Sequence, residues 1–198
     1  MNWKNYLLAI CFVAGINSTA SAGMEPQALV ENVANQTIER LKADKAKIKK
    51  DPKHIHVLVN ELVLPHFDFE QMTKWALGKY WRKAKKDQRA KFIEEFKMLL
   101  VRTYGTSLSE YADQVIKFQP FRGKLASGDV TVRSEVEQPG GFPIPIDYKL
   151  HKKNGDWKVY DVKIDEISLI ANYRTSFAKQ IRRSGLDALL KTLAEKNE

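Results

Sequence analysis

Histidines and neighbouring carboxylates are the side chains of this sequence best suited to bind a metal ion or to move a proton. The histidines are His54, His56, His66 and His151. His54 and His56 would chelate a metal only in an extended segment, because residues two apart on a helix diverge. Asp51-Pro52 is typical of a helix start just before them. Since no other ligands stand at a recognisable spacing, we predict no metal site.

The adjacent carboxylates Glu94-Glu95 and Asp165-Glu166 point in different directions and are more typical of a solvated surface than of an acid–base pair. The sequence contains no H-E-x-x-H, G-x-S-x-G, phosphate loop or dinucleotide fingerprint. Gly140-Gly141 indicates a turn, not a phosphate cradle. An enzyme would therefore lack an identifiable nucleophile or base, and we predict no catalytic residue and no cofactor.

The N-terminus has the order of a secretory signal peptide. Lys4 precedes an apolar run over 7–16, and Ala20-Ser21-Ala22 forms a small-x-small cleavage signal. We predict a signal peptide at 1–22 and a single domain over 23–198. The only cysteine, Cys11, lies within that leader, and no later segment approaches the ~20 apolar residues of a membrane span.

The formal net charge of the whole sequence is +9, from 33 lysines and arginines against 24 acids. Such a balance favours anionic partners: nucleic acid, lipid headgroups or acidic protein surfaces. Export makes nucleic acid the weakest of the three, and we predict no nucleic-acid partner.

Helical periodicity dominates both ends of the chain. We expect helices from Pro26 through Leu41, from Asp51 through Leu62, and from an Asp68 N-cap to Gly78. A long helix is predicted over 86–111, although Gly105 weakens it by up to ~1 kcal/mol. Two more are predicted over 169–181 and 186–193, separated by Gly185.

The middle of the chain alternates between apolar and polar residues, which is typical of strands with one buried face. We predict strands over 115–121, 130–137, 144–151 and 157–164. Asn154-Gly155 is a strong hairpin signal between the last two. The expected fold class is α+β, with helices packed against one face of a curved antiparallel sheet of about four strands.

Four blocks of the sequence, in order, resemble the MlaC family, also called the toluene-tolerance or ABC-transporter auxiliary family. The blocks are LPHFDFEQMTKWALGKYW from Leu64, RAKFIEEFKMLLVRTYGTSL from Arg89, PIPIDYKL from Pro143 and GDWKVYDVKIDEISLIANYRTSFAKQIRRSGLDALL from Gly155. The resemblance extends over nearly all of the chain after residue 22. The sequence departs from the family mainly in its lysine-rich early segment and around His54.

This resemblance implies an NTF2-like fold that encloses an apolar pocket. It further implies a periplasmic carrier of glycerophospholipids that works between an outer-membrane lipoprotein–porin complex and an inner-membrane ABC transporter complex, and so maintains outer-membrane lipid asymmetry. Two alternatives stay open. One is a lipid-free periplasmic adaptor that binds transporter components through a filled core, and the other is an enzyme on the same scaffold.

The candidate lipid-binding residues come from three apolar stripes, on two helices and on the sheet. The same stripes would also form an ordinary packed core. They are Phe96, Leu100, Tyr104, Val132, Val136, Ile146, Tyr148, Leu150, Tyr173 and Phe177.

Two further groups each have two interpretations. The aromatic residues Trp75, Tyr80 and Trp81 would either border the pocket mouth or anchor helix packing. Six lysines over 42–53 would either meet anionic headgroups and acidic partners or form a solvated helix face.

Overall fold

The computed structural model describes residues 24–110, 114–138 and 140–197. The predicted signal peptide lies outside these residues. The fold class is α+β, as predicted. The helices are α1 (Pro26–Ala43), α2 (Lys45–Lys50), α3 (His54–Leu62), α4 (Phe69–Leu77), α5 (Lys79–Lys83), α6 (Lys86–Glu110), α7 (Leu169–Ser184) and α8 (Leu186–Asn197), with short 3₁₀ turns at Leu64–His66 and Leu125–Ser127.

The strands form one antiparallel meander in the order β1-β2-β3-β4-β5. They are β1 (Ile116–Phe118), β2 (Asp129–Val136), β3 (Ile144–Lys153), β4 (Asp156–Ile164) and β5 (Ile167–Ser168). Four correspond to the predicted strands, and the two-residue β5 is an addition. The strand β1 is shorter than predicted and is followed closely by Pro120, which has no N–H for the ladder.

A β-bulge in β4 changes which side chains face the helices. Lys149 pairs with Asp161 and Leu150 pairs with Val159, so Tyr160 is the extra residue. Val159 and Val162, three positions apart, consequently both belong to the apolar side of the sheet, whereas strict alternation would separate them. Tyr160 packs into a different cluster, and its hydroxyl donates to Asp129 Oδ2 at 2.9 Å.

Helix boundaries follow side-chain caps and glycines; Asp68, Gly78 and Gly185 are expected from the sequence, and Ser168 is an additional cap. Asp68 Oδ1 accepts from Gln71 N at 3.1 Å at the start of α4, and Ser168 Oγ accepts from Ala171 N at 3.0 Å at the start of α7. Gly78 and Gly185 end α4 and α7 with φ of 53° and 85°, which favour glycine. The predicted last residue of the long helix, Tyr111, lies outside the described residues.

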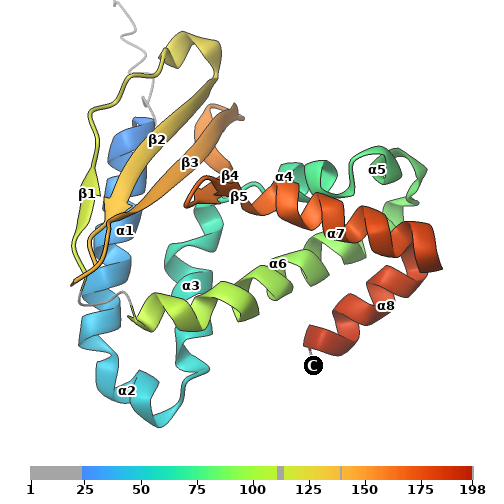
Figure 1. Ribbon diagram of the computed structural model, residues 1–198, viewed down its shortest axis with the longest axis horizontal. Coiled ribbons are helices and arrows are strands. Elements are labelled where there is room, and N and C mark those ends of the chain that lie inside the picture. The colour runs from blue at the N-terminus through green and yellow to red at the C-terminus, as the bar shows by residue number, and fades with distance from the viewer. Residues whose placement is uncertain (1–23, 111–113, 139, 198) are drawn as a thin grey trace, which may run out of the picture.

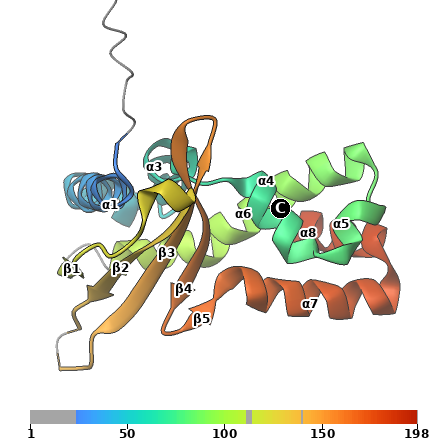
Figure 2. The ribbon, with the colours of Figure 1, turned by 90° about the horizontal axis from the view of Figure 1, so that it is seen from above.

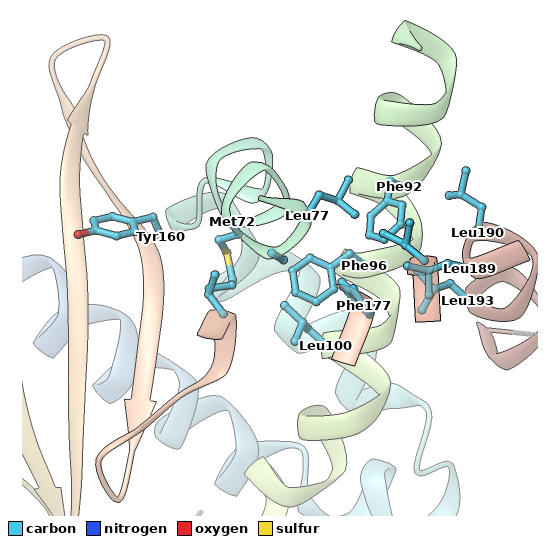
Figure 3. Close-up of a cluster of buried hydrophobic side chains, with 13 residues drawn as sticks. Met72, Leu77, Phe92, Phe96, Leu100, Tyr160, Phe177, Leu189, Leu190 and Leu193 are labelled. Carbon is cyan, nitrogen blue, oxygen red and sulfur yellow. The ribbon is translucent and has the colours of Figure 1, made fainter. Parts of the chain in front are cut away.

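The elements form two halves that share α6 (Figures 1 and 2). The curved sheet, α1 and α3 lie at one end, and α4, α5, α7 and α8 lie beyond the β4–β5 side of the sheet. Phe92, Phe96 and Phe177 meet edge-to-face in the largest packed cluster, at ring-centroid distances of 5.4 Å (Figure 3). This cluster holds α6, α7 and α8 together.

A buried carboxylate joins the two halves. Asp68 is 5% exposed, its side chain lies 3.0 Å from His151 Nε2 and 2.8 Å from Lys153 Nζ, and its N–H donates to Val159 O at 2.8 Å. Burial by itself would raise the pKa of Asp68, but the hydrogen bonds from Lys153, Gln71 N–H and His151 outweigh it and lower the pKa below its ordinary 3.8. The charged form of Asp68 therefore stabilises the fold.

We expect Asp68→Ala to lower the free energy of unfolding by about 2 kcal/mol, measured by urea denaturation at pH 7. The loss combines the helix cap with hydrogen bonds to partners that are partly exposed. Glu39→Ala, at an exposed position of α1, is the control and should change the free energy of unfolding little. Because the pKa of Asp68 is lowered on folding, its contribution is complete above pH 3.8 and disappears as the pH falls through the folded value. An Asp68→Ala penalty that stayed constant into strong acid would contradict this.

Candidate functional site

An apolar cavity of about 280 Å³ lies between the sheet, α1, α3 and the C-terminal half of α6. This volume is just below the usual range of small-molecule pockets, about 300–1,000 Å³. The cavity wall consists of Leu29, Val30, Val33, Ala34, Thr37, Ile38, Leu41, Val59, Val63, Leu64, His66, Phe67, Phe69, Met72, Leu100, Val101, Tyr104, Gly105, Leu108, Ile116, Ile146, Tyr148, Val159, Val162, Ile164 and Leu169.

One complete stripe of α1 forms a side of the cavity. Leu29, Val33 and Thr37 recur at four-residue spacing, so their side chains lie above one another on the helix face. Pro26 stands in the first turn, where its missing N–H costs no helical hydrogen bond. The opposite wall is the apolar face of β3 and β4, where Tyr148 pairs with Val162 and Ile146 pairs with Ile164.

Small residues keep the space between these walls from being filled. Ala34 on α1 and Gly105 on α6 both line the cavity and contribute little or no side-chain volume. A Cβ at Gly105 would lie in ordinary contact, 3.5 Å from His56 Cδ2. The backbone of α6 therefore lies at the wall, in close contact with α3 through His56.

The hydroxyl groups of the wall are hydrogen-bonded to neighbouring protein groups. Thr37 Oγ1 donates to Val33 O at 2.7 Å within α1. Tyr148 shares a hydrogen bond with Ser134, and Tyr104 shares one with Tyr173. Burial, together with the Tyr173 hydroxyl, raises the pKa of Tyr104 to about 12, so both phenols are neutral at pH 7. The wall consequently presents hydrocarbon without an ionised tyrosine.

His66 is the one histidine in the cavity wall as described. Burial lowers its pKa below the ordinary 6.5, and the positive charge of Lys158 adds to this effect. Lys158 Nζ donates to Pro65 O at 2.9 Å, which fixes that charge beside the 3₁₀ turn. His66 is therefore mostly neutral at pH 7, and the cavity wall carries no charge there.

The structure brings four of the ten candidate residues to the cavity wall: Leu100, Tyr104, Ile146 and Tyr148. The other six pack outside the residues of that wall. Phe96, Phe177 and Tyr173 belong to the aromatic cluster of Figure 3 or pack against it. Val132, Val136 and Leu150 are buried within the sheet face, each at most 3% exposed.

Sequence reasoning missed the contribution of α1 to the cavity and that of the segment around Phe67 and Phe69. The stripe of α1 was visible as a helical period, but a period does not identify the surface that it faces. Phe67 reaches the wall because it forms a parallel bridge with Val159 of β4, a long-range contact. No local signal in the sequence indicates this pairing.

His54 and His56 both lie in α3, as the helix start predicted. His54 Nε2 is 2.9 Å from Asp44 Oδ2, and this carboxylate also meets Arg40 and Lys47. Hydrogen bonds from Lys47, His54 and Arg40 hold the pKa of Asp44 well below its usual range. The described residues contain no group of three or more histidine, cysteine or acidic side chains placed to hold a metal ion.

The aromatic residues Trp75, Tyr80 and Trp81 and the lysine-rich segment 42–53 do not belong to the cavity wall. Trp75 is 44% exposed and packs 5.3 Å from the Tyr160 ring, while Tyr80 and Trp81 pack against the aromatic cluster. Tyr80 and Trp81 thus contribute to helix packing, whereas Trp75 packs against β4, and none of the three lines the cavity. The lysine-rich segment forms the short helix α2 and its flanks. Among the helices as described, none is long and apolar enough to cross a bilayer.

Known proteins that are similar to this chain include phospholipid-binding proteins. The family model of the MlaC protein matches residues 31–195. The chain is 26% identical over 191 residues to the intermembrane phospholipid transport system binding protein MlaC of Haemophilus influenzae, covering 95% of this chain and 89% of that protein. It is 32% identical over 170 residues to toluene tolerance protein ttg2D of Pseudomonas putida, covering 84% and 77%.

A solved structure resembles the fold closely. It is that of the phospholipid-binding protein from Ralstonia solanacearum in complex with a phospholipid, with a TM-score of 0.81 and 32% sequence identity. The match covers 88% of this chain and 97% of that one. The likeness thus extends to the sheet and helices that surround the cavity.

We expect the His66 imidazole to titrate below pH 6.5 in an NMR titration, because burial in the apolar wall disfavours its charged form. Lys158→Ala should raise the pKa of His66 only partly, since burial is the larger cause. Because the folded pKa is lowered, any stability that His66 contributes is present above pH 6.5 and falls as the pH drops through the folded value. A His66 pKa of 6.5 or above would contradict burial of the ring in the apolar wall.

Proposed function

The chain belongs to the MlaC family, and on this premise we propose that it is a periplasmic carrier of glycerophospholipids. It binds the acyl chains of one lipid in the cavity and transfers the lipid without a catalytic step. The predicted signal peptide at 1–22 takes the chain to the periplasm. The observation that carries the proposal is the apolar cavity, whose hydroxyl groups are already hydrogen-bonded to the protein.

The energetics of lipid desorption explain why a carrier needs such a cavity. Each methylene exposed to water costs about 0.8 kcal/mol, so two tails with roughly 30 methylenes cost ~20 kcal/mol or more. An apolar wall removes most of this cost, while the headgroup stays hydrated near the surface. Reactive side chains are not required for this task.

We assign the acyl-chain contacts to Leu100, Tyr104, Ile146 and Tyr148 together with the apolar stripe of α1. The six packed candidates support these walls from behind. The cavity volume of about 280 Å³ lies below the usual range of ligand pockets, and the proposal therefore includes a widening of the cavity when two tails enter. Helix α1, which carries the apolar stripe, is the element that moves. Its larger contacts are only with α2, α3 and β2.

The proposed route of the lipid is between an outer-membrane lipoprotein–porin complex and an inner-membrane ABC transporter complex. The names of the relatives support it: one is the binding protein of an intermembrane phospholipid transport system. In this role the protein helps to maintain the lipid asymmetry of the outer membrane.

Native mass spectrometry of the protein purified from a Gram-negative host tests the proposal. We expect a stoichiometric adduct with the mass of a phospholipid, identified after extraction. A clean unliganded mass that persists after incubation with phospholipid vesicles would favour the lipid-free adaptor instead.

A cavity-filling substitution tests the assigned wall. Ala34→Trp places an indole on the cavity side of α1 and should lower the fraction of lipid-bound protein by about tenfold, because the tails and the indole compete for one space. Ala43→Trp at the exposed end of the same helix is the matched control. Circular dichroism should show both variants folded. Equal lipid content in the two variants would remove α1 from the site.

A further inference from the structure

The positive charge of this protein is concentrated in two segments that contain no acid. Residues 71–86 hold six basic side chains and residues 167–186 hold four, with no aspartate or glutamate in either segment. Together they carry +10, while the whole sequence carries +9, so the remainder sums to −1. The ten residues are Lys74, Lys79, Arg82, Lys83, Lys85, Lys86, Arg174, Lys179, Arg182 and Arg183.

These two segments are neighbours in the fold. They form α4, α5 and α7, and α4 packs along α7 (Figures 1 and 2). The Arg174 guanidinium lies over Gly78, at the turn between α4 and α5. The ten residues, which we call the basic face, therefore combine from distant parts of the sequence into one end of the molecule.

The basic face is exposed and electrostatically unneutralised. All ten residues belong to the exposed class. Within the part of the chain that the structure describes, none of the ten forms an ion pair. The ten positive charges repel one another, and because the side chains are exposed, packing does not compensate for this repulsion. Such an arrangement is typical of a surface that binds an anionic partner.

The basic face is separate from the nearest acidic residues, from the cavity and from the lysine-rich α2. Acidic residues resume at Asp87 and Asp187, which lie close together because Gln88 Nε2 donates to Asp187 Oδ1 at 2.6 Å. The cavity lies between the sheet, α1, α3 and α6, and α4 and α7 reach its wall only through Phe69, Met72 and Leu169 in their first turns, none of which belongs to the basic face. The lysine-rich α2 is also separate, and there Asp44 neutralises Lys47 at 2.8 Å.

We propose that the basic face binds the anionic phospholipid surface of a bilayer. Six of its ten cations are lysines, which act as hydrated point charges and suit many mobile phosphates better than the fixed carboxylates of a protein. Trp75, 44% exposed, stands beside them on α4, as aromatic residues do at membrane interfaces. The proposal goes beyond the lipid cargo, since it concerns a second contact, outside the cavity.

This contact has a physical consequence for transfer. Adsorption through the basic face holds the protein at the membrane while leaving the sheet end, with the cavity, free to exchange its lipid. The attraction is long-ranged at low salt and weak enough for release, because it depends on exposed charges that salt screens. Neither helix insertion nor a change in the cavity is needed.

Vesicle co-sedimentation of the full chain tests the basic face. The variant R82Q/R183Q/K83Q/R182Q removes four of its charges, and K42Q/K49Q/K50Q/K53Q removes four exposed charges around α2 as the matched control. On vesicles of phosphatidylglycerol and phosphatidylcholine at low salt, we expect the first variant to bind at least about tenfold more weakly than the unaltered protein. The control should differ less than about threefold.

Three results would overturn the proposal. One is equal weakening by both variants, which would indicate net charge alone. Another is binding of the unaltered protein to pure phosphatidylcholine vesicles as strong as to anionic ones. A third is retention on immobilised polyglutamate without binding to anionic vesicles, which would point to an acidic protein partner. Native mass spectrometry of the same samples separates these results from failure of the carrier function, because loss of vesicle binding leaves the lipid adduct intact.

Discussion

The buried charge of Asp68 is the interaction on which the junction of the two halves depends. A carboxylate this deeply buried is stable only when its lone pairs are matched, and here a lysine, a histidine and a backbone N–H supply the match. These donors come from the β3–β4 hairpin and from α4, so one residue fixes the angle between sheet and helices. Phe67 and Phe69, on either side of it, then lie in the cavity wall.

The cavity lies within the half that contains the sheet. The aromatic cluster around Phe92, Phe96 and Phe177 fills the helical half, whereas the sheet, α1 and α6 surround apolar space with Ala34 and Gly105 in its wall. The helical half is packed densely enough to hold the fold, whereas the half that contains the sheet keeps apolar space that hydrocarbon can fill. The proposed binding of acyl chains depends on the shape and apolarity of this wall, and it needs no reactive side chain.

The charges of the protein are also distributed unevenly between its two halves. The cavity wall is hydrocarbon with neutral phenols and a histidine that burial keeps mostly uncharged. The net positive charge gathers on α4, α5 and α7, at the other end of the molecule. A carrier benefits from this arrangement, since charge close to the cavity would disfavour acyl chains and charge far from it still attracts an anionic surface.

The sequence by itself determined the fold class, the helix cap at Asp68, the hairpin at Asn154-Gly155 and the four longer strands, because these depend on local periodicity and turn chemistry. It also placed Leu100, Tyr104, Ile146 and Tyr148 on apolar stripes, four candidates that reach the cavity wall. Only the tertiary structure decided that Phe96 and Phe177 pack against each other and that α1 forms a wall. It also revealed the bulge at Tyr160, which turns Val159 and Val162 to one face. A stripe reports that a surface is buried, but the long-range contacts of the fold decide whether a side chain or a ligand covers it.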